Sequence, residues 1–122
     1  MIRIGILNKG SIFNWGYNFG YWYFVKYFTK ELNEKGYNIK FYQKIDKEFL
    51  KSDLLIVNSR IYTDTKLNLL KRRLNIKLNY NFIDPLKRLY KQNPNIVWLD
   101  LGDSAGTTQF EVLPFVKKYV KK

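Results

Sequence analysis

The segment 95–116 changes from apolar to polar and back to apolar over a short distance. Residues 96–99 form a run of strand-forming apolar side chains, which is typical of a strand covered on both faces. A polar, glycine-containing loop follows, and apolar residues return at helical spacing from Phe110. Thr108 and Glu111 fit a capping box, so we expect a final helix with Thr108 as its N-cap. In open α/β sheets, ligands bind at the loop between the carboxyl end of a strand and the N-terminus of the following helix, so we expect a site at this loop.

Three earlier segments also have the character of strands. Segment 2–7 alternates aliphatic residues with Arg3 and Gly5, and segment 53–59 is an aliphatic run that ends in polar residues. Segment 37–42 alternates regularly and predicts a half-exposed strand near an edge. With helical patterns between them, these strands predict a Rossmann-like or flavodoxin-like three-layer α/β sandwich with a small parallel sheet of about four strands. We expect residues 1–122 to form a single domain, either complete or the N-terminal half of a longer two-domain protein.

An aromatic-rich helix is expected from about residue 14 to residue 35, with Gly36 ending it. Trp22 and Tyr23 lie off the main apolar side of this helix. They suggest a contact with a second domain, a membrane surface or a partner; the alternative is that they only extend the hydrophobic core. The side predicted to face the core consists of Tyr17, Tyr21, Phe24, Val25, Phe28 and Leu32.

Composition excludes several classes of chemistry. The chain has no cysteine and no histidine, so disulfides, thiolate chemistry, a histidine-based triad and a histidine zinc site are excluded. The net charge of +12 is compatible with an anionic membrane surface or nucleic acid, and coding bias toward lysine explains it equally well. Segment 65–91 is the most basic, but it has few aromatic residues for base stacking, so nucleic acid is the less favoured partner. We interpret the N-terminus as a mature first strand and expect a cytoplasmic protein or one peripheral to the membrane.

Polar side chains follow the predicted strands where their carboxyl ends share one edge of the sheet. Asp100 and Asp103 are the candidate catalytic residues, because paired carboxylates can divide acid and base roles; Asp103 is the preferred base. Capping of a turn by these carboxylates is the structural alternative. Neither a dinucleotide fingerprint nor a phosphate loop is present, and no further acids are spaced for a metal, so we predict no cofactor and no metal in this domain. The candidate ligand-binding residues are Asn8, Gly10, Asn58, Ser59, Ser104, Gly106, Thr107 and Thr108.

The pattern of segments 4–10, 53–59 and 100–109 resembles the N-terminal half of GT-B-type bacterial glycosyltransferases and exostosin-like sequences. The resemblance implies a domain that binds a sugar or lipid-linked acceptor in polysaccharide biosynthesis. It also implies that a nucleotide-sugar donor binds mainly to a second Rossmann-like domain, so this chain is not expected to catalyse transfer alone. A second catalytic domain or a homodimer would then be its partner. The alternatives are a non-catalytic flavodoxin-like module that binds an anion or a protein and, less favoured, a basic nucleic-acid-binding protein.

Overall fold

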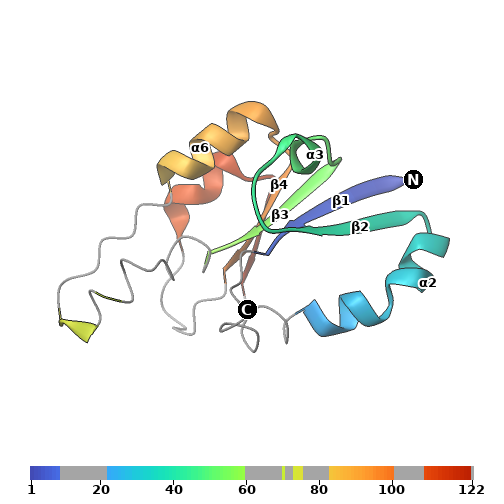
Figure 1. Cartoon of the computed structure of the whole chain (residues 1–122). Coiled ribbons are helices and arrows are strands. Elements are labelled where there is room, and N and C mark those ends of the chain that lie inside the picture. The colour runs from blue at the N-terminus through green and yellow to red at the C-terminus, as the bar shows by residue number, and fades with distance from the viewer. Residues whose placement is uncertain (9–21, 60–69, 71–72, 76–82, 101–108, 122) are drawn as a thin grey trace. The chain divides into compact units, whose positions relative to one another are not determined.

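The computed structural model describes residues 1–8, 22–59, 70, 73–75, 83–100 and 109–121 (Figure 1). The elements with described bounds are β1 (Ile2–Leu7), α2 (Thr29–Glu34), β2 (Tyr37–Tyr42), α3 (Lys47–Leu50), β3 (Leu54–Asn58), α6 (Ile83–Gln92), β4 (Ile96–Asp100), the 3-10 helix η2 (Phe110–Phe115) and β5 (Lys118–Lys121). The chain forms two compact units, Met1–Ile56 and Val57–Lys122. The alternation of strands and helices confirms the predicted α/β class.

The strands form a five-stranded sheet in the order β2-β1-β3-β4-β5. β1 is parallel to both β2 and β3, and β4 is parallel to β5. The parallel arrangement predicted from the aliphatic runs is therefore confirmed, and β2 lies at an edge as its alternating pattern indicated. The sheet has one strand more than expected, because Lys118–Lys121 pairs with β4.

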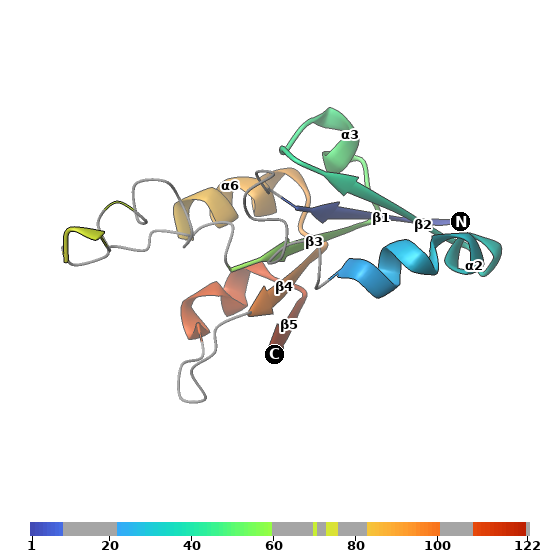
Figure 2. The ribbon, with the colours of Figure 1, turned by 60° about the horizontal axis from the view of Figure 1, so that its bottom comes forward.

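In the first unit, helices cover both faces of the β1–β2 pair. Successive residues of a strand point to opposite faces, so Phe41 and Tyr42 of β2 face different sides. Trp22 packs edge-on against Phe41 with 6.1 Å between ring centroids, and Phe49 of α3 packs against Tyr42 at 5.4 Å. Figure 2 shows α2 and α3 on opposite sides of these two strands.

The long aromatic helix is interrupted by a turn at Phe28 between residues 22–27 and α2. The Thr29 hydroxyl donates to the carbonyl oxygens of Val25 and Lys26, at 3.0 and 2.9 Å. Hydrogen bonds of this kind to the preceding turn often bend helices. Gly36 ends the segment with φ +92°, as predicted, because a side chain is disfavoured at that backbone angle. The predicted first part of the helix lies outside the described residues.

The structure corrects the predicted orientation of this helix only in part. Val25 and Leu32 of the predicted core-facing side are half-buried, and Tyr23 is exposed, as its position off that side predicts. Trp22 is only 8% exposed, whereas Phe24, assigned to the core-facing side, is 69% exposed. Phe28 is exposed as well. The prediction was wrong because aromatic residues surround the helix on all sides, so spacing could not select the face that packs on the sheet.

The core of the second unit lies between α6, β4 and η2. Leu86 and Leu89 of α6 are buried, and Tyr90 packs edge-on against Phe115 of η2 at 5.9 Å. α6 begins at Ile83, so Asp84 lies in the first helical turn. A carboxylate in the first turn interacts favourably with the helix dipole.

The predicted final α-helix is a short 3-10 helix followed by a strand. Gln109, and not Thr108, is the N-cap of η2, and no side chain caps the helix. Pro114 lies inside η2. Proline lacks the N–H for an α-helical bond and clashes with the carbonyl four residues earlier. This segment is therefore not an α-helix; η2 ends at Phe115, and Val116 adopts the extended conformation that leads into β5.

Candidate functional site

Asp100 is the centre of a polar cluster in the second unit. It is the last residue of β4, and its side chain is only 2% exposed. A charged carboxylate is this deeply buried only where ion pairs or hydrogen bonds compensate for its lost hydration. Its partners therefore determine what it can do.

Two residues of β5 donate to the Oδ2 atom of Asp100. The Tyr119 hydroxyl donates at 2.5 Å, and the Lys121 ammonium donates at 3.0 Å. The Lys121 side chain is 28% exposed, so the ion pair joins a buried carboxylate to a cation at the surface. The parallel register places Asp100 opposite Lys121, which brings these groups together.

The cluster extends through Gln109 to the indole of Trp98. The Gln109 backbone N–H donates to the Tyr119 hydroxyl at 3.0 Å, while its side-chain Oε1 accepts from Trp98 Nε1 at 2.8 Å. Gln109 thus joins the beginning of η2 to both β4 and β5. The network from Trp98 to Lys121 satisfies buried polar groups and fixes the segment that returns from η2 to the sheet.

The pKa of Tyr119 is raised to about 12. Burial is the main cause, and the hydrogen bond to Asp100 acts in the same direction. The Tyr119 hydroxyl therefore remains protonated at neutral pH and serves as a donor to Asp100. Bound in this way by Tyr119 and Lys121, Asp100 is suited to be a fixed acceptor rather than a mobile general base.

Two predicted ligand-binding residues lie next to β4 in the same unit. Asn58 ends β3 and Ser59 follows it; they are 2% and 3% exposed. The Ser59 N–H donates to the Leu99 carbonyl at 2.9 Å. The structure therefore places Asn58 and Ser59 beside the last residues of β4, where Asp100 lies.

Asn8 belongs to the first unit and directly follows β1. Its backbone N–H donates to the Tyr42 carbonyl at 2.7 Å. Its side-chain Oδ1 is buried and has no hydrogen-bond partner within the described part of the chain. The remaining predicted site residues lie outside the described residues: Gly10, Asp103, Ser104, Gly106, Thr107 and Thr108.

Sequence reasoning missed Trp98, Gln109, Tyr119 and Lys121 as members of the cluster. A signal for two of them was present: Tyr119 and Lys121 are two residues apart, which places both side chains on one face if the segment is a strand. The prediction of a continuing helix obscured this signal. Gln109 and Trp98 carry no comparable signal, because their bond depends on the path of the intervening loop.

Searches against protein-family models and curated proteins find no match to this chain. Among the described residues, no group of three or more acidic side chains is placed to hold a metal ion. None of the helices in the described ranges combines the length and the apolar character needed to cross a membrane.

Proposed function

We propose that this chain is a Rossmann-like binding domain that holds a sugar or lipid-linked acceptor at the carboxyl ends of β3 and β4. The observation that carries the proposal is the burial of Asn58, Ser59 and Asp100 where these strands end. Ligands of open α/β sheets bind outside the carboxyl ends of strands. Amide, hydroxyl and carboxylate groups are also suitable donors and acceptors for sugar hydroxyls.

We further propose that this domain does not catalyse transfer alone. Tyr119 and Lys121 already engage Asp100, so this carboxylate orients groups rather than accepting a proton from an acceptor hydroxyl. The resemblance to GT-B glycosyltransferases supplies the more specific version of the proposal. In that version, this chain is the acceptor-binding half, Asp103 is the candidate base, and a second domain holds the nucleotide-sugar donor.

Binding is tested by titrating isotope-labelled protein with methyl glycosides of common hexoses and, separately, with UDP-glucose. We expect saturable NMR shifts at Asn58, Ser59 and the Trp98 indole with at least one glycoside, and weaker shifts with UDP-glucose. Asn58→Ala should weaken glycoside binding at least fivefold, because it removes the amide side chain at the end of β3 from the proposed site.

Asn93→Ala is the matched control for this experiment. Asn93 is a buried asparagine that precedes β4, at the opposite end of the strand from Asp100. Asn93→Ala should lower thermal stability without changing glycoside affinity. Absence of shifts with every glycoside, together with a stable dimer in sedimentation, would instead favour the flavodoxin-like interaction module.

A second proposal concerns an exposed aromatic patch formed by Tyr23, Phe24, Tyr27 and Phe28. These four side chains are 45% to 69% exposed and contact one another in sequence, with 5.0 to 6.1 Å between ring centroids. Lys30, one turn after Tyr27, is exposed as well. Exposed aromatics with nearby lysines are typical of segments that lie in the interface of an anionic membrane, so we propose a peripheral location there.

Membrane binding is tested by co-sedimentation with phosphatidylserine-containing vesicles. Phe24→Ser combined with Phe28→Ser should weaken binding at least tenfold, since each phenylalanine contributes about 1.5–3 kcal/mol when its ring leaves water. Phe110→Ser is the control, because Phe110 is 69% exposed, as Phe24 is, but lies in the second unit. Equal binding by the wild type and the double variant would reject the patch as the membrane contact.

A further inference from the structure

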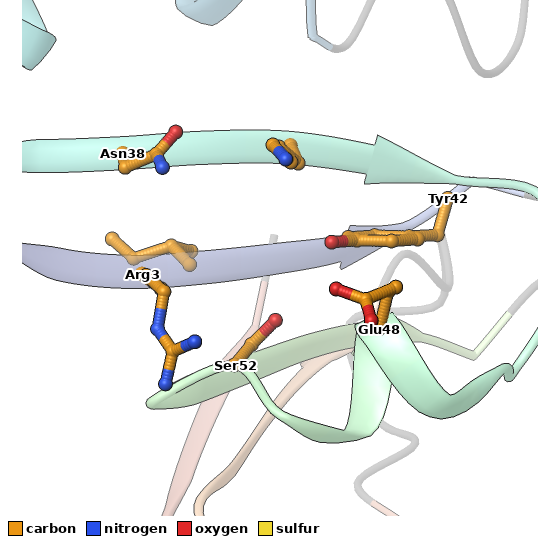
Figure 3. A pocket seen from close by; sticks show the side chains of 7 residues that line it. Arg3, Asn38, Tyr42, Glu48 and Ser52 are labelled. Carbon is orange, nitrogen blue, oxygen red and sulfur yellow. The ribbon is translucent and has the colours of Figure 1, made fainter.

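The first unit contains a polar cavity of about 100 Å³ between β2 and α3. Its walls come from β1, β2 and the segment of α3, and Figure 3 shows the side chains around it. The polar residues among those that line it are Arg3, Asn38, Lys40, Tyr42, Glu48 and Ser52. Pockets that enclose drug-sized ligands measure about 300–1,000 Å³, so this cavity suits a small ion or a single functional group.

The cavity is formed because α3 approaches β1 closely at Gly5. A Cβ atom at Gly5 would be 2.6 Å from Ser52 Oγ and 3.0 Å from the Phe49 ring. The absence of a side chain at Gly5 thus lets Ser52 reach the surface of β1, where Ser52 is only 7% exposed. The strand register places Asn38, Lys40 and Tyr42 on the same face of β2, so their side chains line the opposite wall.

Two cations contribute to the cavity, and one of them is held in place. The Arg3 backbone N–H and Nε both face Asp53 Oδ2, at 2.8 and 3.6 Å. The backbone hydrogen bond from Arg3, followed by the Arg3 charge, lowers the pKa of Asp53, which therefore stays ionised at neutral pH. Lys40 has no hydrogen-bond or ion-pair partner among the residues that the structure describes.

Among the described residues, Glu48 is the one carboxylate that lines the cavity, whereas Lys40 and Arg3 can only donate. Its carboxylate is also 3.2 Å from the Lys51 ammonium, at an exposed position. An anion in the cavity would be attracted by Lys40 and Arg3 and could accept from the Tyr42 hydroxyl. An anion with a protonated oxygen could also donate to Glu48, whereas an anion without a proton would be repelled by it.

We infer that this cavity binds a phosphate group through Lys40 and Arg3, and that Glu48 selects phosphate over sulfate. At neutral pH, inorganic phosphate and phosphomonoesters retain a proton in part of the population, but sulfate has none to donate. The size of the cavity fits the phosphate group itself, so any attached sugar or glycerol would remain outside. This site belongs to the first unit, whereas the cluster around Asp100 belongs to the second.

Isothermal titration of the full chain with inorganic phosphate, glycerol 3-phosphate and sulfate tests the inference. We expect saturable binding of phosphate, with sulfate at least tenfold weaker. Lys40→Met should weaken phosphate binding at least fivefold, and the exposed Lys44→Met should leave it unchanged. Tighter glycerol 3-phosphate binding would identify a phosphomonoester as the ligand, and equal or weaker binding would identify free phosphate.

Glu48→Gln is a second test, in which the expected result is a gain of sulfate binding and not a loss of phosphate binding. Removing the carboxylate charge should strengthen sulfate binding and reduce the preference for phosphate to less than threefold. Absence of phosphate binding by the wild type would overturn the inference. Equal phosphate affinity in the wild type and Lys40→Met would overturn it as well.

Discussion

Asp100→Asn is expected to lower the free energy of unfolding by about 2–4 kcal/mol. The substitution leaves a buried amide where Tyr119 and Lys121 now donate to a carboxylate through Oδ2. Hydrogen bonds to charged groups contribute about 1.5–3 kcal/mol each to stability. The Asp100–Lys121 ion pair contributes less than a fully buried one, because Lys121 is partly exposed to solvent. Chemical denaturation monitored by circular dichroism measures the effect.

The pKa of Tyr119 provides a second measurement of the same contact. In the wild type it is raised to about 12, mainly by burial and then by the hydrogen bond to Asp100. Asp100→Asn removes the carboxylate but leaves the burial, so the pKa of Tyr119 should fall toward its ordinary value without reaching it. The difference in ultraviolet absorbance between each protein and its Tyr119→Phe derivative isolates this one tyrosine during an alkaline titration.

Glu34→Gln is the control, because it removes the same charge from an exposed position. It should change stability by less than about 0.5 kcal/mol. Combining Asp100→Asn with Lys121→Met should cost less than the sum of the two single changes, because each removes a partner of the other. If Asp100→Asn left stability unchanged while weakening glycoside binding, Asp100 would contact the ligand and would not stabilise the fold.

Gly5→Val is expected to destabilise the first unit by about 3 kcal/mol or more. Its Cβ alone would lie 2.6 Å from Ser52 Oγ and 3.0 Å from Phe49, and Phe49 is completely buried. The Ser52 hydroxyl can rotate away, but the ring and the additional valine methyl groups cannot be accommodated unless α3 moves. Thermal unfolding followed by near-ultraviolet circular dichroism would report the loss of aromatic packing.

Gly36→Val is the informative comparison for this substitution. A Cβ atom at Gly36 would have no heavy atom within 4 Å, but Gly36 adopts φ +92°, so the cost of a side chain there comes from backbone strain alone. That strain is about 1–3 kcal/mol and should not depend on Ser52. Ser52→Gly should restore part of the stability lost in Gly5→Val, because it removes the contact with Ser52 Oγ, and none of that lost in Gly36→Val. Equal effects of Ser52→Gly in both backgrounds would show that close packing of α3 on β1 is not the cause.

Several local features could be predicted directly from the chain. The apolar runs within β3 and β4 predicted parallel strands, because few other environments accommodate such short apolar segments bounded by polar residues. The alternation in β2 predicted an edge strand, and Gly36 predicted the end of the aromatic helix. These predictions depend on neighbouring residues and on the backbone, which are fixed by the sequence itself.

Other features depended on which distant segments meet. The spacing of aromatic residues allowed two faces of the helix to pack, and contact with Phe41 selected the face that carries Trp22. The segment Lys118–Lys121 became a strand only because β4 offered it a parallel partner. Pro114 in addition prevented the preceding segment from continuing as an α-helix.

The candidate site likewise has some features that the sequence predicts and others that only the tertiary structure determines. Asn58, Ser59 and Asp100 were identified because each follows or ends an apolar run, so the sequence by itself determined that polar groups would occur at these strand ends. Their burial, and the partners of Asp100, were decided only by the fold: Tyr119 and Lys121 are 19 and 21 residues away along the chain. The local sequence specifies which residues carry charge and where strands end. A carboxylate loses its hydration, and gains hydrogen bonds and ion pairs that compensate for the loss, only when separate segments pack together.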